Sequence, residues 1–471
     1  MIRRHFAQRS VFEVLLPDGE KLWDPVLREI DRILDDEELV ELVSDALASR
    51  RPRSRRFGRP GTPAEVVLRV LVLKHLQDWS FEDCEREIRG SLLWRAFCRI
   101  DCERVPDSKT LIRLSHLIGS ESLKKAIARL VKIGVQRGVI RGGKLRVDTT
   151  VVETNVHYPT DSSLLADGVR VLSRTARKLL EVVGKSTVCL RNRMRSVNQR
   201  AFEIAHLSRR AMQEQVKARM QTLYRELIAI TRAAVREAQS AARSAIRRAH
   251  DLPTSTRERA RPLAERIRHV VDLVQRVIQQ TRARVFKGNT KHPDKVLSLF
   301  ETHTEAIRKG KASKPTEFGK LVKIQEAEAQ FITDYHVCRT RVPDVDLWSP
   351  SLTVHKALFG RPPHLAVADS GFSSGANRRT ATELGVRRVA LPKSGALSKT
   401  QRAHQHQRWF RRALRWRTGS EGRISALKRR HGLDRCLYRG LHGVDRWVGL
   451  GVVANDLLAL GRALQPPRRS A

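Results

Sequence analysis

Several features that mark familiar protein classes are missing from this sequence. Its six cysteines are scattered, with no Cys-x-x-Cys pair, which excludes a dense disulfide scaffold and is typical of reduced cysteines in a cytosolic protein. It has no long apolar run and no apolar signal-peptide core, so we expect no membrane partner and a cytoplasmic location. It also lacks a Gly-x-x-x-x-Gly-Lys-Ser/Thr phosphate loop and a Gly-x-Ser-x-Gly elbow. Nucleotide-driven chemistry and serine-hydrolase chemistry are therefore not indicated.

Acidic residues are scarce compared with basic ones. The chain of 471 residues has 91 Lys and Arg against 50 Asp and Glu, a formal net charge of +41. Self-repulsion of this size disfavours a compact protein unless a polyanion neutralises it, and each phosphate contact with nucleic acid also releases counterions. Because 41% of the residues are hydrophobic, we expect folded domains, and the length indicates two or three of them. Nucleic acid is the expected partner.

The first 140 residues are expected to be helical. Residues 1–50 form a locally acidic helical segment, and residues 51–61 form a basic linker rich in Pro, Gly and Arg. Arg53, Arg55 and Arg56 of this linker either follow a DNA phosphate backbone or remain solvated. Residues 62–140 read as short helices with tight turns, which form either a helix-turn-helix-like DNA reader or a purely structural domain.

One short stretch, residues 144–155, reads as a strand with at least one buried face. Leu145, Val147, Val151 and Val152 supply its apolar side chains, and Asp148 lies in the middle of the run. An unpaired carboxylate is costly to bury there, so Asp148 either pairs with a cation or holds a metal ion. The alternative is a solvated Asp at a sheet edge. Residues 141–164 are the expected first part of an α/β core.

Residues 165–300 change character and are expected to be a helical insertion. No Gly or Pro occurs between residues 185 and 252. Within this stretch, apolar residues recur at alternating spacings of four and three, which is the heptad pattern of a packed helix. Residues 262–282 predict a second amphipathic helix. The prediction is a coiled-coil-like helical hairpin. It either dimerises the protein, or grips DNA with its arginine-rich face, or only presents a solvated charged face. The seam residues are Val216, Met220, Leu223, Leu227, Ile230 and Ala234.

The α/β pattern resumes in residues 301–464. We expect a two-stranded hairpin at residues 321–325 and 330–337, and an apolar strand at residues 364–369 that ends in Asp369. A helix at 375–384, a strand at 386–391 and a basic helix at 411–430 follow. Residues 447–464 are expected to be a closing segment that is helical in its second half, followed by a basic tail at 465–471.

Three acids from these elements are the candidate catalytic residues: Asp148, Asp369 and Glu421. Carboxylates gathered from two strands and a helix can hold two divalent cations about 4 Å apart, and oxygen ligands suit Mg²⁺ or Mn²⁺. Such a pair supports in-line phosphoryl transfer. Arg417 and Lys428 fall within a sector of about 40° around Glu421 on a helix, aimed at DNA phosphates. The alternative is a plain Arg417–Glu421 ion pair.

The order Asp148 … Asp369 … Arg417-x3-Glu421-x6-Lys428 resembles the signature of bacterial DDE-type insertion-sequence transposases, in an ISNCY-like group. The helix motif of that group begins with a Tyr, where this chain has Leu414, so the contact of that tyrosine is not carried over to this chain. Residues 146–155, 368–373 and 62–117 also look like segments of these enzymes. The resemblance implies an RNase H-like α/β core, interrupted by the helical insertion and preceded by the all-α domain.

The resemblance also implies a function and a set of partners. It implies a DNA transposase that cuts and joins element ends with two Mg²⁺ or Mn²⁺ ions bound by Asp148, Asp369 and Glu421. The implied partners are double-stranded DNA, as terminal inverted repeats and target, and a second copy of the chain on that DNA. The location is cytoplasmic, at the bacterial nucleoid. Arg417, Lys428, Arg423, Arg53, Arg55 and Arg56 are the expected DNA-binding residues.

Two other functions stay open from the sequence. A transposase-derived protein that only binds DNA would use the +41 charge without catalysis, and a nuclease with the same core would cleave without joining. A tyrosine recombinase is disfavoured, because none of Tyr158, Tyr224, Tyr335 and Tyr438 lies in an Arg/His/Tyr constellation.

Overall fold

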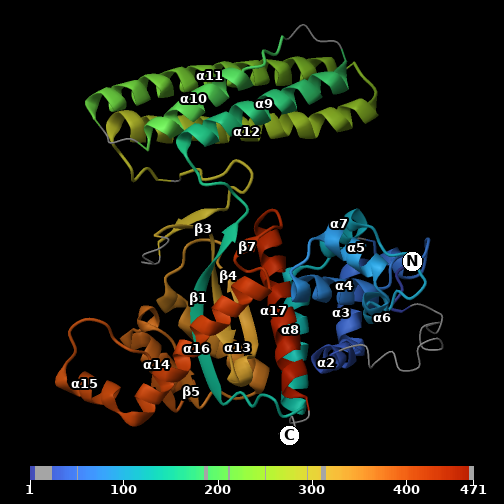
Figure 1. Cartoon of the computed structure of the whole chain (residues 1–471), viewed down its shortest axis with the longest axis vertical. Helices are drawn as coiled ribbons and strands as arrows, with labels where there is room; N and C mark the ends of the chain where they lie inside the picture. The colour runs from blue at the N-terminus through green and yellow to red at the C-terminus, as the bar shows by residue number, and fades with distance from the viewer. Residues whose placement is uncertain are drawn as a thin grey trace. The chain divides into compact units, whose positions relative to one another are not determined.

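The chain folds into two compact units, seen in a computed structural model (Figure 1). The structure describes residues 1–5, 24–49, 51–184, 189–209, 213–249, 251–293, 295–308 and 315–465. The first unit comprises Met1–Asn155 and Glu305–Ala471, and the second comprises Val156–Thr304. Part of the expected N-terminal helical segment and the basic tail after residue 465 lie outside the described residues. The boundaries of the second unit are close to those expected for the insertion.

The N-terminal part of the first unit is helical. The basic linker contains one short 3-10 turn, and the chain after it has no helix or strand until α4. The elements are α2 (Pro25–Leu34), α3 (Glu37–Ala48), η2 (Pro52–Arg55), α4 (Ala64–Gln77), α5 (Phe81–Gly90), α6 (Leu92–Phe97), α7 (Ser108–Ser115) and α8 (Ser120–Gln136).

A mixed sheet forms the centre of the first unit. Its path runs β2-β3-β1-β5-β6, with β4 paired to β3 and β7 paired to β1. The β1 strand is antiparallel to β3 and parallel to β5, and β5 is parallel to β6. The strands are β1 (Lys144–Thr154), β2 (Glu305–Ile307), β3 (Glu317–Glu326), β4 (Ile332–Val337), β5 (Leu365–Val367), β6 (Arg388–Ala390) and β7 (Arg435–Cys436). The expected β3–β4 hairpin is confirmed.

Helices cover both faces of this sheet, and the side chains of β1 are buried on both of its faces. Leu145, Val147 and Val151 pack with residues of α13 and α14, whereas Val152 packs with the N-terminal helices and α17. The remaining elements of the unit are η3 (Glu328–Gln330), η4 (Asp344–Leu347), α13 (Trp348–Phe359), η5 (Ser370–Phe372), α14 (Gly375–Glu383), α15 (Lys399–His406), α16 (Arg408–Arg430) and α17 (Leu441–Ala463).

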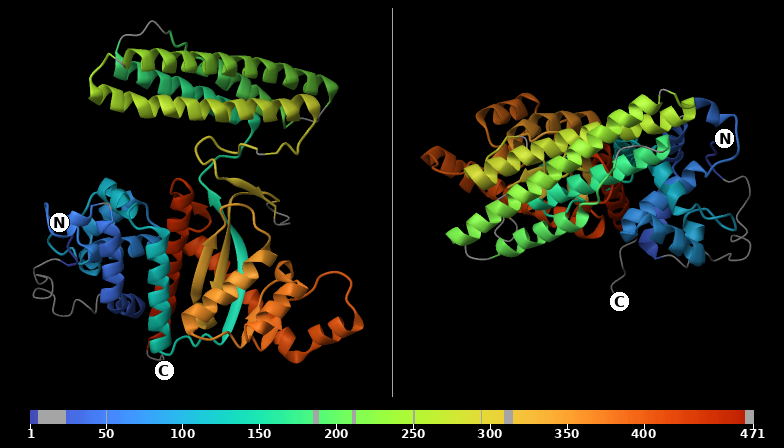
Figure 2. Two further views of the ribbon diagram at one scale, coloured as in Figure 1. Left: turned by 180° about the vertical axis from the view of Figure 1, so that it is seen from behind. Right: turned by 90° about the horizontal axis from the view of Figure 1, so that it is seen from above.

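The apolar helix α17 joins the N-terminal helices to the sheet. It packs against α8, α2 and α4 on one side and against β4 on another, so one continuous hydrophobic core spans both (Figures 1 and 2). The expectation that only the second half of residues 447–464 is helical is wrong, since α17 already begins at Leu441. Its glycines allow close contacts: a Cβ on Gly449 would lie 2.5 Å from the Tyr335 hydroxyl. No described helix is both long and apolar enough to cross a bilayer.

The second unit is a four-helix bundle in its described residues, and not the two-helix hairpin that we expected. The helices α9 (Asp161–Val183), α10 (Met194–Leu207), α11 (Glu214–Ala249) and α12 (Thr254–Lys287) pack side by side (Figure 2). The second amphipathic helix starts at Thr254, so Pro262 lies inside it. Periodic burial of Ala260, Ala264 and Ile267 continues through the proline, which explains why the helix does not begin there.

The heptad seam of α11 is used within the unit. Leu223, Leu227 and Ala234 are buried, but so are Tyr224 and Ile228 beside them. This stripe is wider than a two-helix seam because α11 packs on both α9 and α12. These side chains are therefore covered by the chain's own helices.

Candidate active site

Asp148 lies near the middle of β1, on the face that α16 covers. Its side chain is 14% exposed. The backbone N–H of Thr149 donates to Oδ1 at 2.8 Å, and the hydroxyl of Ser420 on α16 donates to Oδ2 at 2.8 Å. The carboxylate is therefore held by two donors, and the alternative of a freely solvated Asp at a sheet edge does not apply.

Asp369 follows the neighbouring strand at the level of Asp148. Parallel pairing sets Lys144 opposite Leu365 and Arg146 opposite Val367. Two more residues of this register bring Asp369 level with Asp148. There Asp369 caps the short turn η5, where the backbone N–H of Gly371 donates to its Oδ1 at 2.9 Å. Asp148 and Asp369, which are 221 residues apart in the sequence, therefore lie side by side at one end of β5.

Asp369 lies among other negative charges. Burial raises the pKa of Asp369, and the charges of Asp148 and Asp344 raise it further. The Gly371 hydrogen bond and the charge of Arg417 act in the opposite direction. The pKa of this carboxyl group is therefore above its ordinary value, and a cation placed among the three acids would lower it.

Asp344 is a third acid of this cluster that the sequence did not indicate. It begins η4, and the hydroxyl of Thr149 donates to its Oδ1 at 3.1 Å. A Cβ on Gly371 would lie 3.1 Å from Oδ2 of Asp344 and 3.1 Å from Oδ1 of Asp369. Both carboxylates therefore lie close to Gly371, and a side chain at this position would crowd them. No periodic pattern surrounds Asp344, and its Pro-Asp context was the only local signal.

The helix α16 reaches the sheet through Arg146, the neighbour of Asp148 on the same face of β1. The Arg146 guanidinium donates to Oε2 of Glu326 at 2.8 Å and to the carbonyl of Trp416 at 2.6 Å. A Cβ on Gly419 would lie 2.6 Å from Nη1 of Arg146, so any larger residue would displace this guanidinium from its place against the helix. The docking places the next residue, Ser420, against Asp148.

The three motif residues of α16 have different surroundings. Nη1 of Arg417 lies 3.9 Å from Oδ2 of Asp148, and Nη2 lies 3.9 Å from Oε1 of Glu421. The Glu421 side chain is 71% exposed, whereas that of Asp148 is mostly buried. Nζ of Lys428 lies 3.5 Å from Oε1 of Glu317 on β3. The structure thus brings Arg417 to Asp148 and leaves Glu421 facing solvent.

Of the other expected DNA-binding residues, one is mostly buried and three are exposed. Arg423 is only 12% exposed; its guanidinium donates to Asn455 at 2.9 Å and also contacts Gln330. Arg53, Arg55 and Arg56 are exposed, and Arg55 pairs with an aspartate of α3. Arg423 therefore anchors α16 within the core, whereas the three linker arginines face solvent.

A groove of about 410 Å³ opens beside Asp369. Arg417, Arg415 and Lys393 line it together with Leu414, the residue at the position of the family's tyrosine. Asp369 is the one acid in this lining, among the residues that the structure describes. The groove therefore offers several cations next to one carboxylate, which suits a phosphate diester approaching an acidic site.

The described residues contain no group of three His, Cys, Asp or Glu side chains already converged as a metal site. The chemistry of the donors nevertheless fits a hard divalent cation, since Asp148, Asp344 and Asp369 offer carboxylate oxygens only. The raised pKa of Asp369 also fits a site where negative charge gathers, and Gly371 lets the carboxylates of Asp344 and Asp369 approach the same point. These acids therefore suit Mg²⁺ or Mn²⁺ in donor type and charge.

Comparison with known proteins identifies two segments of the chain. Residues 12–117 match a family described as a transposase domain (DUF772), and residues 378–460 match a transposase DDE domain. The second segment includes Arg417, Ser420, Glu421 and Lys428, whereas Asp148 and Asp369 lie outside both.

One curated relative is an uncharacterized protein, ORF8 in the nfe locus of Rhizobium meliloti. It is 29% identical over 130 residues, which cover 26% of this chain. The chain spans 63% of the length of that relative. No solved structure matches the chain. Two separate segments of the chain are thus similar to transposase domains, and this similarity supports a bacterial DDE-type insertion-sequence transposase.

Proposed function

We propose that this protein is a DNA transposase that cuts and joins the ends of an insertion sequence by phosphoryl transfer. The observation that carries the proposal is the meeting of Asp148 and Asp369 at the same level of neighbouring parallel strands, under a helix within the segment that matches a transposase DDE domain. Their charges act on one another, and a groove lined by cations adjoins them.

Asp148 and Asp369 would hold the divalent cation, Mg²⁺ or Mn²⁺. When bound, such a cation activates an attacking oxygen and stabilises the leaving oxygen of an in-line displacement. Ser420 keeps the Asp148 carboxylate in one orientation through its hydrogen bond. Arg417, Arg415 and Lys393 bind the phosphates beside the scissile bond and fix the strand in the groove.

Two residues compete for the role of the third carboxylate. Glu421 has the motif spacing, but in this structure its side chain faces solvent beyond Arg417. Asp344 lies beside Gly371, as Asp369 does, and its charge raises the pKa of Asp369. We assign the role to Glu421, with Arg417 moving from between the acids to a DNA phosphate, and we assign Asp344 to supporting Asp369.

The sheet supports an RNase H-like core. Its strands β4-β3-β1-β5-β6 are antiparallel on one side of β1 and parallel on the other, with the acids on β1 and after β5. The remaining parts of the proposal are an ISNCY-like group, terminal inverted repeats and target DNA as substrates, a dimer on DNA, and action at the nucleoid. The exposed Arg53, Arg55 and Arg56 beside the N-terminal helices would contact flanking phosphates.

The test is cleavage and strand transfer with Asp148→Asn, using duplexes that carry the sequences flanking the coding region and Mg²⁺ as cofactor. We expect loss of both reactions by at least about a thousandfold, because a ligand carboxylate is removed, with DNA binding retained. Glu383→Gln, an exposed acid of α14 in the same unit, is the matched control.

Three outcomes would contradict the proposal in different ways. Parental rates for Asp148→Asn would exclude Asp148 as a ligand. Cleavage without joined products would indicate a nuclease. Metal-independent DNA binding with no cleavage by the parent would indicate a transposase-derived binding protein.

A further inference from the structure

The four-helix unit presents a row of cations along one side of α9. Arg170, Arg174 and Lys178 follow one another at intervals of four residues, so they lie on one face of the helix. All three side chains are exposed. At a rise of about 1.5 Å per residue, the row offers one positive charge about every 6 Å.

A fourth cation faces this row from α12. Arg266 lines a groove of about 360 Å³ together with the α9 cations, Leu263 and Phe300. Phe300 is 51% exposed, and the Arg170 guanidinium lies 5.8 Å from the centre of its ring. We refer to this feature, lined by Arg170, Arg174, Lys178, Arg266 and Phe300, as the α9–α12 groove. It contains an apolar ring beside several cations.

The cations of this groove are only partly neutralised. Arg170 pairs with Asp167 on its own helix. Within the described residues, by contrast, no carboxylate lies at ion-pair distance from Arg174, Lys178 or Arg266. No acid is among the residues that line the groove. Three neighbouring cations without counter-charges repel one another, and an anionic ligand would relieve this repulsion.

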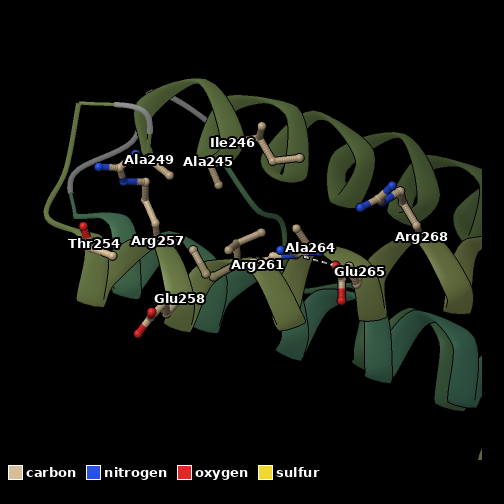
Figure 3. A pocket seen from close by; sticks show the side chains of 12 residues that line it. Ala245, Ile246, Ala249, Thr254, Arg257, Glu258, Arg261, Ala264, Glu265 and Arg268 are labelled. Atoms are coloured by element: carbon tan, nitrogen blue, oxygen red, sulfur yellow. Dashed lines mark hydrogen bonds and ion pairs between the residues drawn. The ribbon is translucent and has the colours of Figure 1, made fainter.

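Another hollow of the same unit provides a contrast. It measures about 590 Å³ and lies between α11 and α12, where Arg257, Arg261 and Arg268 share the surface with Glu258 and Glu265 (Figure 3). Arg261 donates to Glu265 at 2.9 Å. Arg268 and Arg266 are separated by about 200° around α12, so they face different sides of the helix. Both hollows of this unit are rich in arginine, but of the two only the α9–α12 groove has no acid in its lining.

We propose that the α9–α12 groove binds the sugar–phosphate backbone of duplex DNA, which gives the inserted unit a DNA-binding role of its own. A duplex strand carries one phosphate about every 3.4 Å of axis, so each cation of the row can reach a phosphate. The Phe300 ring offers a surface for a deoxyribose between two such contacts. The inference rests on the proposed function only in taking DNA as the ligand, and it does not depend on the chemistry at Asp148.

The test uses the full chain with Asp148→Asn, without divalent cations, so that binding is measured without cleavage. Binding of a duplex of arbitrary sequence is measured over a range of salt concentrations, for Arg174→Gln/Lys178→Gln/Arg266→Gln and for its parent. If each side chain contacts one phosphate, the slope of log K against log salt should become less steep by about 2.7, at about 0.9 per contact. All three residues are exposed, so melting temperatures should match the parent.

The matched control is Arg257→Gln/Arg261→Gln/Arg268→Gln, which removes the same charge from the hollow in Figure 3. It should change the slope by less than about 1. Equal changes in both variants would overturn the groove as a site and leave only diffuse charge. An unchanged slope in both would show that the unit does not contact DNA. Loss of binding to vesicles of acidic lipid, with DNA binding intact, would assign the groove to a membrane surface instead.

A failure of the catalytic proposal would look different. It would appear as parental cleavage by Asp148→Asn in Mg²⁺, whatever the salt slopes are.

Discussion

The hydroxyl of Ser420 donates a hydrogen bond to the Asp148 carboxylate at 2.8 Å, across a sequence separation of 272 residues. This contact ties β1 directly to the helix that carries the Arg417 and Glu421 motif. Of the two neighbouring residues, Ser420 points inward to the acid and Glu421 points outward, as a rotation of about 100° per residue requires.

Ser420→Ala should weaken both stability and catalysis. Loss of one partly buried hydrogen bond to a charged group should lower the free energy of unfolding by about 1.5–3 kcal/mol. The released Asp148 should slow cleavage mainly through kcat, with little change in KM, because DNA binding does not use the hydroxyl. Urea unfolding and steady-state cleavage measure the two effects. Ser425→Ala on the same helix is the control, and equal effects in both variants would refute a special role for Ser420.

Asp344→Asn and Glu421→Gln separate the two candidates for the third carboxylate. We expect Glu421→Gln to abolish cleavage even in excess Mn²⁺, because a ligand is lost. Asp344→Asn should instead slow cleavage by about ten- to a hundredfold, and high Mn²⁺ should restore part of the rate. The reason is that Asp344 does not bind the metal itself but supports its ligand Asp369. Asp346→Asn, an exposed neighbour in η4, controls for the local change. The reverse ranking would transfer the ligand role to Asp344.

The pKa of Asp369 predicts how stability depends on pH without metal. Burial and the charges of Asp148 and Asp344 raise this pKa, so the folded state holds the proton more tightly than the unfolded state. The stabilisation that comes from protonated Asp369 is complete below the pKa of this group in the unfolded chain, about 4. It is lost as the pH rises through the pKa of the same group in the folded protein. Without divalent cations, Asp369→Asn should therefore melt at a higher temperature than the parent near neutral pH.

Adding Mg²⁺ should reverse this order. The parent should gain melting temperature by mass action, and Asp369→Asn should gain much less. Thermal melts with and without Mg²⁺ are the measurement. A parent that gains nothing from Mg²⁺ or Mn²⁺ would contradict metal binding at these acids.

His431 predicts a loss of stability in acid. Burial lowers the pKa of His431 to about 4, and its Nδ1 lies 3.1 Å from the carbonyl oxygen of His75. Between about pH 6.5 and 4 this histidine is protonated in the unfolded chain but neutral in the folded one. The free energy of unfolding therefore falls over this range, by about 3 kcal/mol in all. His431→Gln should flatten this part of the stability curve, whereas the exposed His442→Gln should not. Unfolding titrations at several pH values decide between them.

Local patterns in the sequence were sufficient for the strand around Asp148, the strand before Asp369 and the basic helix around Glu421. They were not sufficient for contacts made by tertiary packing. Helix geometry placed Arg417, Glu421 and Lys428 in one sector, but it could not tell which side of α16 faces the sheet. Arg146 and Gly419 decide that orientation, and they are far apart in the chain. Arg423 illustrates the same limit, because its charge suggested DNA and its partners lie in the core.

The expected hairpin shows a related limit of periodicity. A heptad seam records that a helix packs on a neighbour, but it does not record how many neighbours it has. Tyr224 and Ile228 widen the buried stripe of α11 and accommodate two of them. Asp344 could not be found at all, because a short turn without periodicity carries no pattern that marks an acid as buried.

The pairing of the strands also brings together the two points where the chain leaves the sheet for the helical unit and returns from it. Glu153, at the end of β1, and Glu305, at the start of β2, both pair with Gly319 of β3. The points where the chain leaves and re-enters the sheet therefore lie only about 10 Å apart, across one intervening strand. A short flexible link could close that gap without disturbing any strand pairing, so the helical unit could be gained, lost or exchanged as a cassette while the acids around Asp148 stay in place.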